Sequence, residues 1–200
     1  MKRTLMLAQV LVLTAGAAVF ADDKDKAKAN DNKKDFQEYV DKYGTPGPEH
    51  KLLEPLVGSF QTRVKCWMDP TESPQVSEGT VQRKAKLDGR YICEEAESKF
   101  NSQPYHGFGT IGYDRAKKKF VYSWIDSMST AIKLQHGTYD EGAKTWTFKM
   151  EDTCPVTGKP VRMRDMLKIV SANEQLMEFY RQLGDEKEMK VMEINFTRTK

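Results

Sequence analysis

The sequence predicts an all-β protein, a barrel or sandwich of about ten antiparallel strands that follows one or two short helices, and of the two we expect the barrel. Three observations predict this class. From residue 57 onward apolar and polar residues alternate with a period of two, turn signals recur at even spacing, and no long helical pattern interrupts them. Ten strands in roughly 140 residues is a normal size for one closed barrel, and closure removes the edge strands of such a meander.

The chain begins with a pattern typical of a secretory signal peptide. A basic start, Met1-Lys2-Arg3, precedes an apolar run that ends at Val19-Phe20-Ala21, a cleavage site before Asp22. We therefore expect residues 1–21 to be removed and the protein to be exported, to the periplasm or to the medium. No other apolar run approaches a membrane-spanning length, so no membrane span is expected after cleavage.

The composition argues against a nucleic-acid partner. The 200 residues carry a formal net charge of +3, and loss of Lys2 and Arg3 with the signal peptide lowers it to +1. A near-neutral protein lacks the basic surface that attracts nucleic acid. The sequence identifies no protein partner.

Two segments separate the signal peptide from the barrel. Residues 22–34 hold no apolar side chain larger than Ala, which predicts a disordered charged tether. Within residues 35–56 two short helices are expected, interrupted by the Gly- and Pro-rich segment 44–48. The first carries an apolar stripe of Phe36, Tyr39, Val40 and Tyr43, and the second an apolar side of Leu52, Leu53 and Leu56.

Residues 57–200 are predicted to form a single barrel domain. Strand formers alternate with polar residues in ten segments, and clusters of Gly, Asp and Pro separate several of them. The predicted strands are Phe60–Met68, Val76–Lys86, Arg90–Phe100, Tyr105–Tyr113, Lys119–Ser127, Ala131–Tyr139, Thr145–Glu151, Val161–Ser171, Gln175–Arg181 and Glu188–Arg198.

The segment 105–127 is predicted to be a hairpin rich in aromatic residues and glycine. A four-residue loop at 114–117 would place Gly109 opposite Tyr122 and Gly107 opposite Trp124, where a glycine leaves space for a ring to lie over the backbone. One face of this hairpin would carry Tyr105, Ile111, Tyr113, Phe120, Tyr122, Trp124 and Asp126.

Gly107, Gly109 and Gly112 also spell the G-x-G-x-x-G pattern of dinucleotide-binding proteins. That pattern binds a pyrophosphate only where a helix begins directly after it. Here a turn and a second strand follow, so the glycines are interpreted as relief of crowding in a bent strand.

The cysteines and histidines predict neither a disulfide nor a metal site. A third strand would separate Cys66 from Cys93 by roughly 10 Å, too far for a bond. None of His50, His106 and His136 has a second ligand at a useful spacing. We therefore expect no metal, haem or other cofactor.

Four short motifs resemble a known family. Residues 58–60 (GSF) are similar to the G-x-W opening of lipocalin-like proteins, with Phe in place of Trp. Residues 87–91 (LDGRY), 107–114 (GFGTIGYD) and 124–127 (WIDS) follow in an order that resembles the bacterial family called domain of unknown function 1579. The resemblance implies an exported lipocalin-like (calycin) barrel. It implies no activity and no catalytic residue.

A barrel of this strand number can enclose a ligand cavity or be filled by its own side chains. Alternating positions would line its interior with Tyr122, Trp124, Trp146, Phe148, Met163, Leu167, Met192 and Ile194. The predicted ligand-binding residues are Tyr122, Trp124, Asp126, Trp146 and Arg164. Asp126 or an arginine could orient a polar head group. Asp126 could instead belong to a buried ion pair or cap the turn at residues 127–129.

Three functions are compatible with these patterns. The first is an exported barrel that binds a small apolar or amphiphilic ligand. The alternative is a non-catalytic envelope or interaction domain with a filled barrel. The third is a hydrolase of a small ester or lipid that acts through Asp126 or His106, although no nucleophile lies in a catalytic motif. The sequence favours binding over catalysis.

Overall fold

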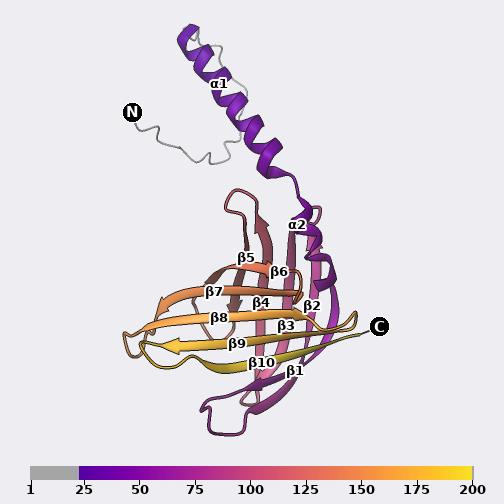
Figure 1. Ribbon diagram of the computed structural model, residues 1–200, viewed down its shortest axis with the longest axis vertical. Coiled ribbons are helices and arrows are strands. Elements are labelled where there is room, and N and C mark those ends of the chain that lie inside the picture. Colours follow the sequence, from indigo (N-terminus) through magenta and orange to yellow (C-terminus); the bar gives the residue numbers. More distant parts are fainter. Residues whose placement is uncertain (1–22, 200) are drawn as a thin grey trace. The chain divides into compact units, whose positions relative to one another are not determined.

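The structure is a computed structural model, and it describes residues 23–199 (Figure 1). The predicted signal peptide, residues 1–21, lies outside the described residues. The chain divides between Asp41 and Lys42 into two compact units. Among residues 23–199 no helix combines the length and the apolar character needed to cross a bilayer.

The N-terminal unit contains α1 (Asp23–Tyr39), which leads into the π-helical turn η1 (Val40–Gly44). The expectation of a disordered tether at residues 22–34 is therefore corrected: residues 23–34 are helical. The physical reason is that Ala and Lys, which make up seven of these twelve residues, are strong helix formers even without an apolar face. The expected apolar stripe is not buried, since Phe36 and Tyr39 are exposed.

The second unit is a closed barrel of ten antiparallel strands. Each strand pairs with the next, and β1 pairs with β10 from Phe60 opposite Arg198 to Cys66 opposite Met192. The strands are β1 (Gly58–Cys66), β2 (Gln75–Lys86), β3 (Tyr91–Phe100), β4 (Gln103–Asp114), β5 (Lys119–Asp126), β6 (Lys133–Asp140), β7 (Thr145–Thr153), β8 (Pro160–Ile169), β9 (Glu174–Leu183) and β10 (Met189–Arg198). All ten predicted strands are confirmed, with ends that move by at most a few residues.

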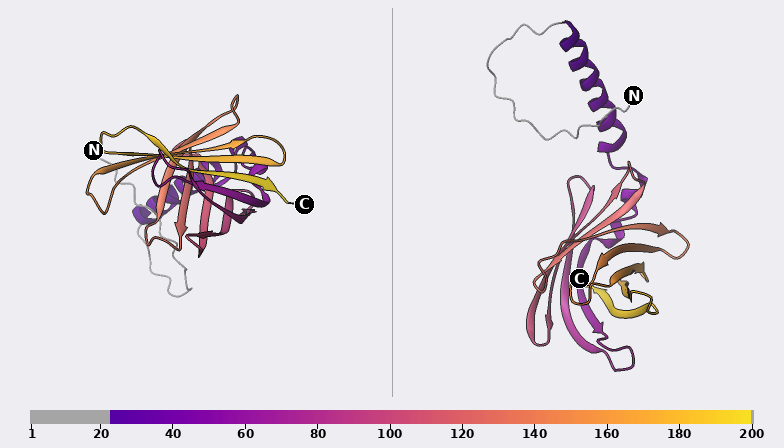
Figure 2. Two further views of the ribbon diagram at one scale, coloured as in Figure 1. Left: turned by 90° about the horizontal axis from the view of Figure 1, so that it is seen from below. Right: turned by 90° about the vertical axis from the view of Figure 1, so that its left-hand side faces the viewer.

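Two curved walls make up the barrel. In Figures 1 and 2, strands β2–β5 form one wall and cross β7–β10, which form the other. The alternation seen in the sequence follows the pleat: one set of side chains points into the barrel and the other points outward.

Two short helices close one end of the barrel, and we call this the helix end. They are α2 (Pro48–Lys51) and the 3-10 turn η2 (Glu54–Leu56), in place of one predicted helix over 49–56. Leu53 and Leu56 are fully buried against the core. Arg198 Nη1 donates to the carbonyl of Val57 at 2.6 Å, which ties this segment to β10.

The predicted hairpin register is wrong by two residues. Gly109 lies opposite Trp124, and Gly107 lies opposite Asp126. The loop begins one residue later than expected because the Asp114 carboxylate accepts hydrogen bonds from the amides of Ala116 and Lys117. A shift of two keeps every side chain on its face, so the predicted aromatic face is correct.

Candidate ligand-binding cavity

A cavity of about 1120 Å³ occupies half of the barrel. It extends from the middle of the barrel to the loops opposite the helix end, which we call the loop end. There the type I′-like turn of Asn101 and Ser102 and the loop residue Met128 border it. Its apolar wall includes Val64, Ala96, Met163, Phe179 and Ile194.

The cavity exists because inward-facing side chains become smaller toward the loop end. Along β2 the inward positions from the helix end are Arg83, Val81, Gly79 and Ser77, and along β3 they are Ile92, Glu94, Ala96 and Ser98. Large residues fill the helix end instead: Phe60, Ile92, Ile111, Phe120, Trp146, Phe148, Leu167 and Phe196 are buried there. A cavity and a filled interior, the two alternatives expected from the sequence, therefore coexist, one in each half of the barrel.

Trp124 forms part of the cavity wall and lies flat over two glycines of β4. A Cβ atom at Gly107 would collide with Trp124 Cζ2, and one at Gly109 would lie 2.8 Å from Trp124 Cε3. The predicted use of glycines to seat a large ring is thus present, with Trp124 over both positions.

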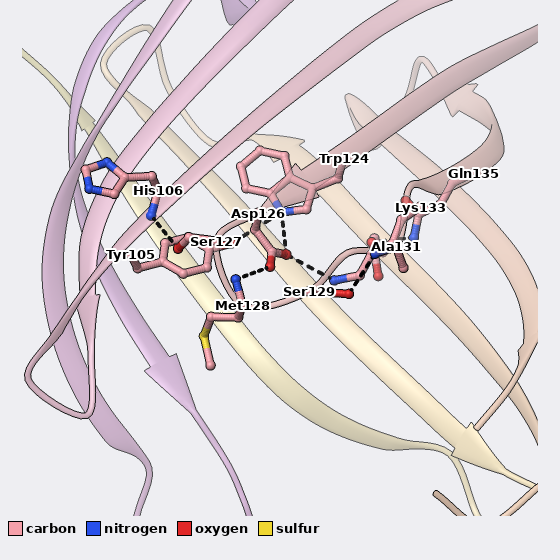
Figure 3. Close-up of polar contacts among 11 residues, drawn as sticks. Tyr105, His106, Trp124, Asp126, Ser127, Met128, Ser129, Ala131, Lys133 and Gln135 are labelled. Carbon is pink, nitrogen blue, oxygen red and sulfur yellow. Dashed lines mark hydrogen bonds and ion pairs between the residues drawn. The ribbon is translucent and has the colours of Figure 1, made fainter. Parts of the chain in front are cut away.

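A polar network surrounds Asp126 near the loop end (Figure 3). Asp126 Oδ2 accepts a hydrogen bond from the indole N–H of Trp124 at 3.2 Å and forms an ion pair with Lys133 at 3.4 Å. Asp126 Oδ1 accepts from the amide of Met128 at 3.0 Å. Two predicted alternatives for Asp126 therefore apply together, an ion pair and a turn cap, although the cation is Lys133 and not an arginine.

A second polar group lies at the inner end of the cavity, next to the packed core. Arg83 and Glu94 form an ion pair in which both side chains are almost fully buried. Arg83 Nη1 also donates to Gln175 Oε1 at 2.5 Å, and its guanidinium lies 4.4 Å from the ring centroid of Phe196. Of the three polar side chains, Glu94 faces the cavity.

Asp165 and Gln135 complete the inner end. Gln135 Nε2 donates to Asp165 Oδ2 at 2.7 Å, and both residues are 3% exposed and line the cavity. Asp165 Oδ1 and Gln135 Oε1 have no hydrogen-bond partner in the described protein. Burial raises the pKa of Asp165 to about 7, against smaller opposing effects of Gln135 and Lys133.

Two tyrosines stand between these polar groups. Burial, followed by the charge of Asp126, raises the pKa of Tyr105 to about 12. Burial raises the pKa of Tyr122 well above its ordinary value, and the carboxylates of Glu94 and Asp165 act in the same direction. Both phenols remain neutral near pH 7 and can donate hydrogen bonds.

The structure brings some of the five predicted ligand-binding residues together and separates the others. Tyr122 and Trp124 line the cavity, and Asp126 contacts the wall residues Trp124 and Lys133. Trp146 is fully buried in the packed half, with its ring 4.5 Å from that of Tyr139. Arg164 pairs with Glu188 at 2.6 Å on the outer side of β8.

The residues missed by sequence reasoning are Arg83, Glu94, Gln135 and Asp165. Arg83, Glu94 and Asp165 are charged at positions whose strand neighbours two residues away are apolar, as with Asp165 between Met163 and Leu167. Gln135, between Lys133 and Gly137, carries no such signal. That interruption of the alternation was the available signal. It marks an inward polar side chain, although it does not reveal its partner.

The cysteines and histidines of the described chain lie apart. The three cysteines are free, and β2 separates Cys66 from Cys93. His106 and His136 are exposed on strands β4 and β6, and no group of three metal-ligating side chains occurs among residues 23–199.

Comparison with known proteins gives a family and a fold. A family model described as "Protein of unknown function (DUF1579)" matches residues 45–198. The crystal structure of Rv2717c from M. tuberculosis is similar with a TM-score of 0.58 and 14% identity, over 78% of this chain and 100% of that one. A redesigned β-barrel aligns at a TM-score of 0.38 and 14% identity, over 76% and 95% of the two chains. No curated protein matches.

Proposed function

The chain belongs to DUF1579, a family of proteins of unknown function, and on that premise we propose that it is an exported binding protein whose barrel holds a small apolar or amphiphilic molecule. The observation that carries the proposal is the cavity of about 1120 Å³, which is just above the usual range of roughly 300–1,000 Å³ for ligand pockets. The wall is more apolar than polar, and buried polar side chains such as Glu94, Gln135 and Asp165 converge on its inner end, as in other small-molecule sites.

Binding would follow from burial of the ligand. Apolar parts of the ligand would leave water and contact Val64, Met163, Phe179 and Ile194, at about 25 cal/mol for each Å² removed from water. The ring of Trp124 is held from both sides, by the glycines below it and by hydrogen bonds from its indole N–H to Tyr105 and Asp126. A fixed aromatic wall loses little entropy when a ligand binds.

The hydrolase hypothesis receives no such support. The histidine that it names, His106, lies exposed on β4. Asp126 is engaged by Trp124, Met128 and Lys133.

Uptake of the neutral dye Nile red tests the proposal. The wild-type protein should enhance its fluorescence in a saturable way, because the dye enters an apolar site. Ala96→Trp places an indole in the cavity and should reduce dye affinity by at least about tenfold. Ala116→Trp, in the exposed β4–β5 loop, makes the same change outside the barrel and should bind dye normally. Absence of dye binding by the wild type, or equal binding by Ala96→Trp, would refute the proposal.

Export is the second part of the proposal, supported by the signal-peptide pattern of residues 1–21. Expression of the full chain in a Gram-negative bacterium should deliver the protein to the periplasm or medium with Asp22 as its first residue. Intact mass and N-terminal sequencing measure this. A cytoplasmic product that retains Met1-Lys2-Arg3 would contradict it.

A further inference from the structure

We propose that the inner end of the cavity recognises an organic cation, a protonated amine carried on an apolar chain. This inference rests on the proposed ligand-binding function and adds the chemical class of the head group. The site consists of Asp165, Gln135, Tyr122 and the ring of Phe179, all of which line the cavity.

One carboxyl group inside the barrel has no cation paired with it. Glu94 is paired with Arg83, and Asp126 is paired with Lys133. Asp165 forms no ion pair with any described Lys or Arg, and it is 3% exposed. The inner end of the cavity therefore holds one carboxyl group more than its cations balance, and a bound cation would balance it.

The unpaired hydrogen-bond acceptors that line the cavity also favour a cationic head group. Asp165 Oδ1 and Gln135 Oε1 are buried acceptors without a partner, and both residues line the cavity. The buried donor Arg83 Nη2 also has no partner, but Arg83 does not line the cavity. An ammonium group carries three donors and no acceptor, so it can satisfy such oxygens, whereas a carboxylate head group cannot. Rotation of the Asp165 carboxyl about its terminal torsion exchanges its two oxygens, so one can reach the cavity while the other keeps Gln135.

Aromatic rings complete the site. Tyr122 and Phe148 have ring centroids 5.5 Å apart, and Tyr122 and Trp124 have centroids 6.1 Å apart. Phe148 and Phe179 are the direct strand partners of Asp165. Rings around a desolvated cation stabilise it through their negative faces, which is the usual environment for bound ammonium ligands.

Asp165 also predicts how amine affinity depends on pH. The groups that face it are Gln135 and Lys133 from β6 and Tyr122 from β5, while Arg164 lies on the outer side of its own strand. Asp165 titrates near neutrality, because burial holds its pKa at about 7. Affinity for an ammonium ligand should therefore rise with pH up to about pH 8 and then level off, and binding near pH 7 should release a proton.

Displacement of Nile red by three ligands with the same twelve-carbon chain tests the inference. Dodecylamine should bind the wild type about tenfold to a hundredfold more tightly than dodecanol, and dodecanoate should bind more weakly than either. Asp165→Asn should remove the preference for the amine. Glu151→Gln, on the exposed face of β7, makes the same charge change outside the barrel and should leave the preference intact.

The outcomes separate the inference from the proposed function. Saturable dye binding with no preference for dodecylamine, or a preference that survives in Asp165→Asn, would overturn the cation site and leave the binding function standing. Absence of dye binding would overturn both. Proton release on amine binding, measured by calorimetry in buffers of different ionisation enthalpy, tests the site in the wild type alone and needs no variant.

Discussion

Arg83 is the most deeply buried charge in the described barrel, and its side chain joins three parts of the interior. It pairs with Glu94 on β3, donates to Gln175 on β9 and contacts the rings of Phe60 and Phe196. A buried ion pair adds little stability over an apolar replacement, but the loss of one partner leaves an uncompensated charge.

Arg83→Met should therefore destabilise the protein by about 3–5 kcal/mol, since Glu94 would remain buried without a counterion. The double variant Arg83→Met/Glu94→Met should recover most of this loss. Urea unfolding monitored by tryptophan fluorescence measures both. A single variant as stable as the wild type would show that Glu94 does not depend on Arg83.

Asp165 should make the stability fall as the pH rises. Its pKa is about 7 in the folded protein and near 4 in the unfolded chain. Between these values the folded state keeps a proton that the unfolded state has lost, so this contribution is fully present below about pH 4 and is lost as the pH rises through about 7.

Asp165→Asn cannot lose a proton, so its advantage over the wild type should grow from about pH 4 to about pH 8. The difference should reach on the order of 4 kcal/mol. Urea midpoints measured across this range test the expectation. A constant difference between the two proteins would mean that Asp165 does not titrate with folding.

At the scale of elements, the β4–β5 hairpin shows both what sequence reasoning found and where it failed. The aromatic alternation identified the two strands and their inward face. The register depended on where the loop began, and the two amide hydrogen bonds to Asp114 decided that. In a charged run like residues 114–119 several loop boundaries fit the sequence equally well, so the sequence alone does not show which residue caps the loop.

Gly107→Val tests the contact between this hairpin and Trp124. Its side chain would occupy the space of the indole ring, so the ring must move, and the protein should lose about 1–3 kcal/mol. Trp124 should also become more exposed, with a red-shifted emission. Gly142→Ala is a matched control, because a Cβ there meets only Asp140 Oδ1 at 3.4 Å and no positive φ is required. Equal stability of Gly107→Val and Gly142→Ala would contradict the observed register.

At the scale of the whole molecule, the sequence was sufficient to predict the barrel but not to predict the candidate site. Strand alternation and turn spacing are local properties, and a closed meander is their simplest consequence. The candidate site joins Gln135 on β6 to Asp165 on β8 across β7, and Arg83 on β2 to Gln175 on β9. These pairings depend on barrel curvature and on cavity size, which no local pattern encodes.

The division of the chain between Asp41 and Lys42 gives a prediction about the whole molecule. Residues 30–39 are exposed along their helix and add no described side chain to the buried core, whereas Leu53 and Leu56 are fully buried at the helix end. A chain of residues 42–200 should therefore unfold at the same urea concentration as one that begins at Asp22. Leu53→Ala in the shorter chain should cost about 2–5 kcal/mol, because it leaves a cavity in the packed half. A marked loss of stability on removing residues 22–41 would show that the N-terminal unit supports the barrel.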